Sequence, residues 1–218
     1  MIFLVLPVKA CCRIGLTKYK CIENKIFNDL ETMERVKEFL YASADLKKKV
    51  ADTLSGDILE VANCIKACLL KGGKLILMGN GGSAGDSQHI AAELVGRFKK
   101  ERRAMPAIAL TVDTSSLTAL GNDYGFDAIF ERQLEALGHK NDAVLGISTS
   151  GNSENVVRAL KKAKAIGAET IGLVGNDGGK IREVADLSII IPSNDTARIQ
   201  EVHITIGHII CELIDADL

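Results

Sequence analysis

Residues 143–160 read AVLGISTSGNSENVVRAL, and this stretch decides the fold class. An apolar run, Ala143–Ile147, leads into the hydroxyl-rich loop Ser148–Ser153, and a helical pattern follows at Glu154–Ile166. The run is continuously apolar and does not alternate with polar residues, which is typical of a strand buried on both faces of a parallel sheet. A strand, a polar loop and a helix in this order form one unit of an α/β fold.

The same unit recurs on both sides of this stretch. Further apolar runs lie at Leu75–Met78, Ala107–Val112, Thr170–Val174 and Leu187–Ile191. Helical patterns alternate with the runs at Ala84–Arg97, Ser115–Leu120, Phe126–Leu137, Lys180–Val184 and about Thr196–Asp215. This alternation predicts a doubly wound α/β sandwich with a central five-stranded parallel sheet flanked by helices. Ligands of such folds bind at the carboxyl ends of the strands.

The part of the chain before the first run has a different pattern. Apolar residues recur at helical spacing from Met33 to Leu54, Gly56 suggests a break, and a second amphipathic pattern covers Ile58–Leu69. We therefore expect an N-terminal helical hairpin. Residues 1–32 show no clear periodicity, and we interpret them as an appendage that is either disordered or precedes a natural start at Met33. Residues 33–218 then form a single domain.

Composition narrows the possible functions. A chain of 218 residues, 47% of them hydrophobic, can bury a proper core as one domain. The net charge of −1, the 4% aromatic content and the absence of Trp argue against nucleic-acid or membrane-surface partners. The six cysteines contain no C-x-x-C pair, which argues against a thiolate zinc site and favours reduced thiols in the cytoplasm.

The loop Ser148–Ser153 suits a phosphate group. It carries four hydroxyls beside the free N–H groups of a helix start, and these match the several acceptor oxygens of a phosphate. The structural alternative is that Ser153 simply caps the helix. A cap needs only one such residue, whereas hydroxyls cluster here, so phosphate binding is the favoured interpretation.

A second loop, Gly79–Ser83 (GNGGS), also lies between a strand and a helix. Its glycines let a ligand approach the backbone closely. The loop lacks the Lys-Ser/Thr ending of a P-loop but satisfies G-x-G-x-x-A with Ala84, and Asp113 ends the next run, so a dinucleotide site stays open, as does a plain tight turn. Two phosphate-type loops on two strands favour a phosphorylated polyol over one dinucleotide.

Two helical residue pairs are candidate metal ligands. His89 and Glu93 are four residues apart and share one helix face, whereas Gln200 and His208 are eight apart and differ in direction by roughly 80°. Imidazole nitrogens with carboxylate or amide oxygens suit a zinc-like divalent ion. Each pair alone is more typical of ordinary helix side chains, and spacing does not show whether the two helices meet. The basic run Arg97–Arg103 is interpreted mostly as an exposed helix end.

Four motifs occur in order along the chain: GNGGS at 79–83, GNDYGF at 121–126, GISTSGNS at 146–153 and RIQEVH at 198–203. Together they resemble the sedoheptulose 7-phosphate isomerases, also called phosphoheptose isomerases, of the sugar isomerase (SIS) domain family. The resemblance covers roughly Met33–Leu218 with matching spacing, whereas the serine loop alone marks only the wider SIS family.

The resemblance implies a cytoplasmic homotetramer of SIS domains whose active sites are shared between subunits. It implies conversion of sedoheptulose 7-phosphate to D-glycero-D-manno-heptose 7-phosphate through an enediol(ate), for heptose supply to lipopolysaccharide or related glycans. One zinc ion per subunit is implied, with ligands His89, Glu93, Gln200 and His208. The implied substrate contacts are Asn80, Gly81, Gly82, Ser83, Glu93, Asn122, Asp123, Ser148, Thr149, Ser150, Ser153 and Gln200.

By the same resemblance Glu93 is the catalytic base and His208 the acid. Three alternatives stay open: a non-catalytic SIS protein, an isomerase of another sugar phosphate, and a nucleotide-dependent oxidoreductase. The SIS relative that binds the bacterial replication initiator lacks the residues corresponding to Glu93 and His208. Their presence here therefore favours the isomerase.

Overall fold

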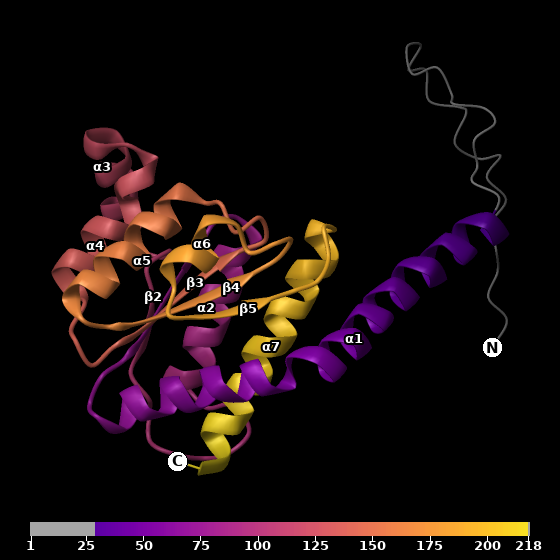
Figure 1. Ribbon diagram of the computed structural model, residues 1–218, viewed down its shortest axis with the longest axis horizontal. Helices are drawn as coiled ribbons and strands as arrows, with labels where there is room; N and C mark the ends of the chain where they lie inside the picture. Colours follow the sequence, from indigo (N-terminus) through magenta and orange to yellow (C-terminus); the bar gives the residue numbers. More distant parts are fainter. Residues whose placement is uncertain (1–28, 218) are drawn as a thin grey trace, which may run out of the picture. The chain divides into compact units, whose positions relative to one another are not determined.

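The computed structural model describes residues 29–217 (Figure 1). Its strands are β1 (Leu75–Gly79), β2 (Ala107–Ala109), β3 (Ala143–Ser148), β4 (Glu169–Val174) and β5 (Leu187–Ile190). Its helices are α1 (Asp29–Leu70), α2 (Gly82–Val95), α3 (Thr114–Tyr124), a short 3-10 helix η2 (Phe126–Ala128), α4 (Ile129–Leu137), α5 (Glu154–Ile166), α6 (Gly179–Val184) and α7 (Thr196–Asp217). All strand pairs are parallel, in the order β2-β1-β3-β4-β5, so the predicted five-stranded parallel sheet is confirmed.

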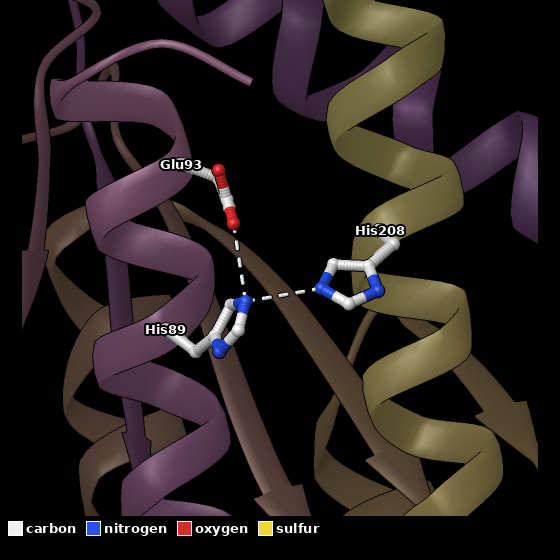
Figure 2. Close-up of side chains that lie close together, drawn as sticks. All are labelled: His89, Glu93 and His208. Carbon is white, nitrogen blue, oxygen red and sulfur yellow. Dashed lines mark hydrogen bonds and ion pairs between the residues drawn. The ribbon is translucent and has the colours of Figure 1, made fainter. Parts of the chain in front are cut away.

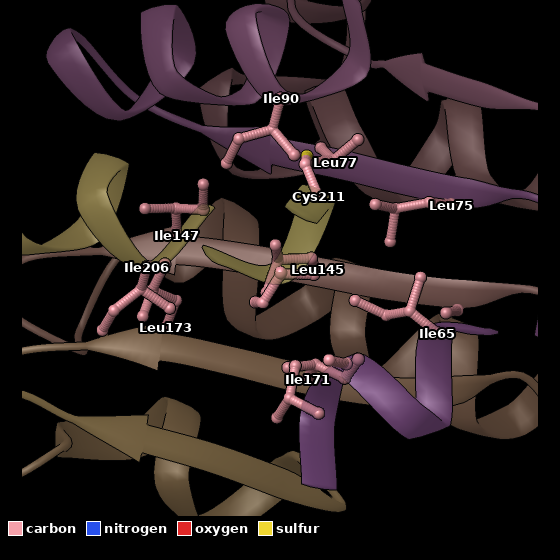
Figure 3. Close-up of a cluster of buried hydrophobic side chains, with 14 of the residues drawn as sticks. Ile65, Leu75, Leu77, Ile90, Leu145, Ile147, Ile171, Leu173, Ile206 and Cys211 are labelled. Atoms are coloured by element: carbon pink, nitrogen blue, oxygen red, sulfur yellow. The ribbon is translucent and has the colours of Figure 1, made fainter. Parts of the chain in front are cut away.

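The sheet separates two hydrophobic cores. Leu75, Leu77 and Leu145 point to the face covered by α2, α7 and the last turns of α1 (Figure 3). Ile76 and Val144 point to the opposite face, where α4, α5 and α6 cover them. All five side chains are at most 1% exposed. Because both faces are buried, both sets of alternate positions are mostly apolar, which explains the continuous apolar runs.

Two predicted boundaries differ from the structure. The run expected to continue to Val112 ends as a strand at Ala109, because β2 is an edge strand that pairs only with β1. The helix expected to end at Leu120 continues to Tyr124, and Gly125 ends it with a φ of 85°. The GNDY part of GNDYGF therefore lies in α3.

The expected helical hairpin at the N-terminus is one continuous helix, α1, which passes through Gly56. A Cβ at Gly56 would meet nothing within 4 Å, and a single glycine costs a helix only about 1 kcal/mol. Val50 and Ile58 are buried on either side of Gly56 and stabilise the helix through packing.

The chain divides after Leu40 into two compact units, and the whole sheet belongs to the second. The interpretation of residues 1–32 as an appendage falls almost entirely outside the described residues. Among the helices that the structure describes, none has both the length and the apolar character needed to cross a membrane.

The strand order determines where a ligand can bind. β1 lies between β2 and β3, so the connection after β1 leads to one side of the sheet and the later strands extend to the other. At such a switch point the loops after the two central strands diverge and leave room for a ligand. Here these are the loops after β1 and β3, which are the two phosphate-type loops of the sequence.

Candidate active site

The loop after β3 gathers three serine hydroxyls. Ser148 Oγ lies 2.9 Å from Ser153 Oγ and 3.4 Å from Ser150 Oγ. Ser153 is the N-cap residue of α5, yet its hydroxyl makes no capping hydrogen bond. Gly151, with a φ of 69°, turns the chain between them. The hydroxyls therefore face one another and not the helix backbone, as binding of a tetrahedral oxyanion requires.

An amide pair joins the two loops. Asn80 and Asn155 exchange two hydrogen bonds of 2.9 Å, one from each Nδ2 to the other Oδ1, and Asn155 is only 2% exposed. Asn80 belongs to the first loop, and Asn155 lies in the first turn of α5. The two loops are thus held in one arrangement, although 75 residues separate the paired side chains.

The loop after β4 supports the serine loop from the other side. Asn176, at a φ of 54°, donates a hydrogen bond of 2.9 Å from Nδ2 to the carbonyl oxygen of Thr149. The N–H of Ile181 donates to the carbonyl oxygen of Gly151 at 2.9 Å. A Cβ on Gly151 would come within 2.2 Å of the Gly178 carbonyl oxygen, so these two loops pack backbone against backbone.

Three candidate metal ligands meet between α2 and α7 (Figure 2). His89 Nε2 lies 3.1 Å from Glu93 Oε1 on the same helix and 3.1 Å from His208 Nε2 on α7. The ligand atoms of all three residues lie within 4.8 Å of one another. The structure thus brings together two helices whose proximity the spacing could not show.

The geometry of this group fits a divalent cation. A tetrahedral ion with metal–nitrogen bonds of 2.0–2.1 Å places two nitrogen ligands about 3.3 Å apart, close to the distance between the two histidine nitrogens. The side chain of His89 is 51% exposed and that of Glu93 is 23% exposed, so the group is open to solvent on one side. An open position is typical of catalytic metal sites and not of structural ones.

The other predicted site residues are placed as follows. Gln200 lies near the start of α7, where its amide packs on Gly82 so tightly that a Cβ there would come within 2.0 Å. Ser83 is buried in the first turn of α2. Asn122 and Asp123 are exposed on α3 and hydrogen-bond to each other at 2.8 Å. The Asn80–Asn155 pair thus joins the first loop to the serine loop, Gly82 of the first loop contacts Gln200, and Asn122–Asp123 lie on a separate helix.

Two buried ionisable groups lie close to this group. Asp86, one turn before His89, is 9% exposed, and burial raises its pKa to about 6 against a lowering effect from His89. His203, on α7 between Gln200 and His208, is fully buried, and neither of its ring nitrogens makes a hydrogen bond with a described residue. Burial lowers the pKa of His203 to about 4, with a smaller opposing effect from the Val174 carbonyl.

The class of protein is defined by the parallel α/β sheet that carries the serine-rich loop Ser148–Ser153 at its switch point. The SIS domain family model matches residues 38–175, and the chain belongs to this family. The phosphoheptose isomerase of Aquifex aeolicus (strain VF5) is 57% identical over 183 residues, which cover 84% of this chain and 96% of that relative. Within the SIS family the chain belongs to the phosphoheptose isomerases, and it is an isomerase.

Solved structures agree with this assignment. The phosphoheptose isomerase from Neisseria gonorrhoeae has a TM-score of 0.81 at 44% identity and is covered over 99% of its length by 85% of this chain. The enzyme from Francisella tularensis has a TM-score of 0.83 at 37% identity with the same coverage. Both values show the same fold over 85% of this chain.

Three residues that contribute to the site were not found from the sequence. Asn155 resembles an ordinary polar residue of a helix start, and Asn176 resembles an ordinary turn residue. Phe98 stacks on His208 with ring centroids 5.7 Å apart and an interplanar angle of 21°. The only sequence signal for Asn176 is a residue type that tolerates positive φ, and no local signal identifies the partners of Asn155 or Phe98.

Proposed function

We propose that this protein converts sedoheptulose 7-phosphate to D-glycero-D-manno-heptose 7-phosphate through an enediol(ate), and so supplies heptose to lipopolysaccharide or related glycans. The observation that carries the proposal is the meeting of His89, Glu93 and His208 on the helix that begins at the first loop and on the helix that packs against it. High identity to phosphoheptose isomerases over nearly their whole length supports the choice of substrate.

The two loops bind the substrate in this proposal. The hydroxyls of Ser148, Thr149, Ser150 and Ser153, with Ser83 from the first loop, hold the phosphate. The sugar hydroxyls contact Asn80, Gly81, Gly82, Asn122, Asp123 and Gln200. The clustering of the Ser150 and Ser153 hydroxyls within 3.4 Å of the Ser148 hydroxyl supports the first assignment.

Glu93 and His208 move the protons. A ketose becomes an aldose when the proton on C1 is removed and a proton is delivered to C2, while the hydroxyl proton passes between the two oxygens. We assign the carbon-bound proton to the Glu93 carboxylate and the oxygen-bound proton to His208. The two residues approach from different helices, so they can act on neighbouring atoms of one substrate. The pairing of Asn80 with Asn155 also fixes the two loops relative to each other, and this positions the other substrate contacts of both loops.

His89, Glu93, Gln200 and His208 would hold one zinc ion per subunit. Their nitrogen and oxygen donors suit zinc, and the 3.1 Å separations of three of them support the assignment. When bound, zinc supplies Lewis acidity that polarises the carbonyl oxygen. Glu93 is assigned both a ligand role and a base role, and a carboxylate that bound the ion would be a weaker base than a free one.

We also propose a cytoplasmic homotetramer. In the second unit the exposed apolar side chains include Val112 and Phe126, which flank α3, Tyr124 at the end of α3, and Ile209 on α7. Exposed apolar side chains that adjoin one another are typical of interfaces between protein copies. Light scattering of the purified protein measures the assembly state directly.

An aldose-formation assay with sedoheptulose 7-phosphate, run with added zinc and with chelator, tests the activity. Turnover that falls with chelator supports both isomerisation and the metal assignment, whereas no turnover by the folded protein rejects the proposed activity. Glu93→Gln should abolish turnover without unfolding. Glu101→Gln, at a side chain 86% exposed in a surface ion pair with Arg97, is the matched control and should retain the native rate.

Ser150→Ala tests the phosphate assignment. It removes one hydrogen bond to a charged group, worth about 1.5–3 kcal/mol, so KM should rise on the order of tenfold or more with little change in kcat. An unchanged KM would remove Ser150 from the phosphate site.

A further inference from the structure

Arg102 is buried where α2 ends. Its side chain is 6% exposed, although it lies within the basic run interpreted as an exposed helix end. Nη2 donates to the carbonyl oxygen of Glu93 at 2.9 Å, and Nη1 donates to that of Leu94 at 3.0 Å. The last carbonyls of a helix have no partner within the helix and carry partial negative charge. The guanidinium therefore caps the turn of α2 that carries the Glu93 side chain.

Asp215 on α7 forms an ion pair with the other edge of the same guanidinium. Arg102 Nε donates to Asp215 Oδ1 at 2.5 Å, and the Asp215 carboxyl side chain is 3% exposed. The backbone N–H groups of Lys99 and Lys100 donate to Asp215 Oδ2 at 3.0 and 3.3 Å. Burial alone would raise the pKa of Asp215, but these hydrogen bonds lower it overall, so the carboxylate stays charged and paired.

Asp215 and His208 share one face of α7. They are seven residues apart, which is almost two full turns and about 10 Å along the axis. The face of α7 that presents His208 to His89 thus presents Asp215 to Arg102. Phe98, from the segment between Glu93 and Arg102, stacks on the His208 ring between these two points.

We propose that Arg102, held by Asp215, is a positioning residue that sets the distance between α2 and α7 and thereby the geometry of His89, Glu93 and His208. The inference rests on the proposed metal-dependent activity. One planar guanidinium joins the end of the helix that carries Glu93 to the helix that carries His208. Its several donors lie in fixed directions, so it fixes the orientation of both helices, which a flexible ammonium cannot do.

The test compares Arg102→Lys and Asp215→Asn with a control of the same chemistry at the other end of the sheet. Asp142 is 1% exposed, pairs with Lys74 Nζ at 2.7 Å and accepts backbone N–H groups of Lys74 and His139. Asp142→Asn therefore weakens a comparable buried ion pair just before β1 and β3, whereas the site lies after these strands. The free energy of unfolding, the zinc affinity by competition with a chromophoric chelator, kcat and KM are measured for each protein.

All three variants should lose stability, and only the Arg102 and Asp215 variants should lose zinc affinity, by about tenfold or more, as expected when partners of metal ligands are removed. Their kcat should fall while KM stays near the native value, because the serine loop is untouched. Arg102→Lys keeps the positive charge but lacks the planar set of guanidinium donors, so its zinc affinity should stay below the native value. Should Arg102→Lys fail to fold, Asp215→Asn, which keeps the guanidinium on α2, carries the comparison.

Native zinc affinity in both Arg102→Lys and Asp215→Asn would overturn the inference, and so would an equal loss of zinc affinity in Asp142→Asn. In either case, native turnover by the unmodified protein would leave the proposed function standing. If the native protein bound zinc but did not turn over sedoheptulose 7-phosphate, the proposed function would fail and the zinc affinities would still decide the inference. A native protein that bound no zinc would overturn the inference, and its turnover would decide the activity separately.

Discussion

Acid should destabilise this protein through His203, whose imidazole is fully buried in α7. Burial lowers its pKa to about 4, whereas an unfolded chain holds histidine near its reference value of about 6.5. Between these two values the unfolded state binds a proton that the folded state does not bind, so the free energy of unfolding decreases as the pH falls. Between about pH 7.5 and about pH 5 the loss from this one residue amounts to about 2 kcal/mol.

Urea denaturation of native protein and of His203→Gln at both pH values measures this contribution. The difference between the two free energies of unfolding should shift by about 2 kcal/mol in favour of the variant on acidification. The comparison cancels the contributions of carboxylates common to both proteins, and both proteins are treated with chelator so that metal binding adds no pH dependence of its own. His139→Gln, at an exposed histidine, is the matched control. A difference that stays constant for His203→Gln over this range would refute the reasoning.

Two further predictions concern backbone strain and thiol burial. Gly151→Ala should cost about 2–4 kcal/mol of stability and raise KM, because the φ of Gly151 is 69° and the new Cβ would meet the Gly178 carbonyl oxygen. Urea denaturation and steady-state kinetics measure the two effects. Near-native values of both would contradict the packing of the loop after β4 against the serine loop. Cys211 is fully buried, and burial raises its pKa to about 12. A thiol reagent at neutral pH should therefore modify Cys211 only when the protein unfolds. Labelling of Cys211 in folded protein, detected by peptide mass mapping, would contradict its burial.

The sheet could be predicted from the sequence because its burial leaves a local signature. Each strand is mostly apolar at both sets of alternate positions and is followed by a helix, so the patterns at Ala143–Ile147 and Glu154–Ile166 can be recognised within one short window of sequence. Gly56 shows the limit of such signals, since packing on both sides of a glycine overrides a weak local preference. The end of β2 was missed because it depends on the lack of a second neighbouring strand.

The sequence predicts the candidate metal ligands only as two separate pairs, His89 with Glu93 and Gln200 with His208. His89 with Glu93 follows from spacing on one helix, but the 3.1 Å approach of His208 depends on how α7 packs against α2. The burial of Arg102 also depends on packing between distant segments. A basic run is normally solvated, and the ion pair with Asp215, 113 residues further along the chain, makes burial of this arginine possible. Non-local charge pairing of this kind leaves no periodic trace in the sequence.

The order of the strands has a consequence for how the enzyme matures. The Asn80–Asn155 pair spans 75 residues, and the His89–His208 contact spans 119 and involves the last helix. Contacts this distant form only after large loops have closed. During synthesis the loops after β1 and β3 can therefore meet well before His89 and His208 do. A nascent or truncated chain ending before α7 would hold Asn80 and Asn155 but not His208, so under the proposed mechanism catalytic competence requires the final helix to leave the ribosome and dock.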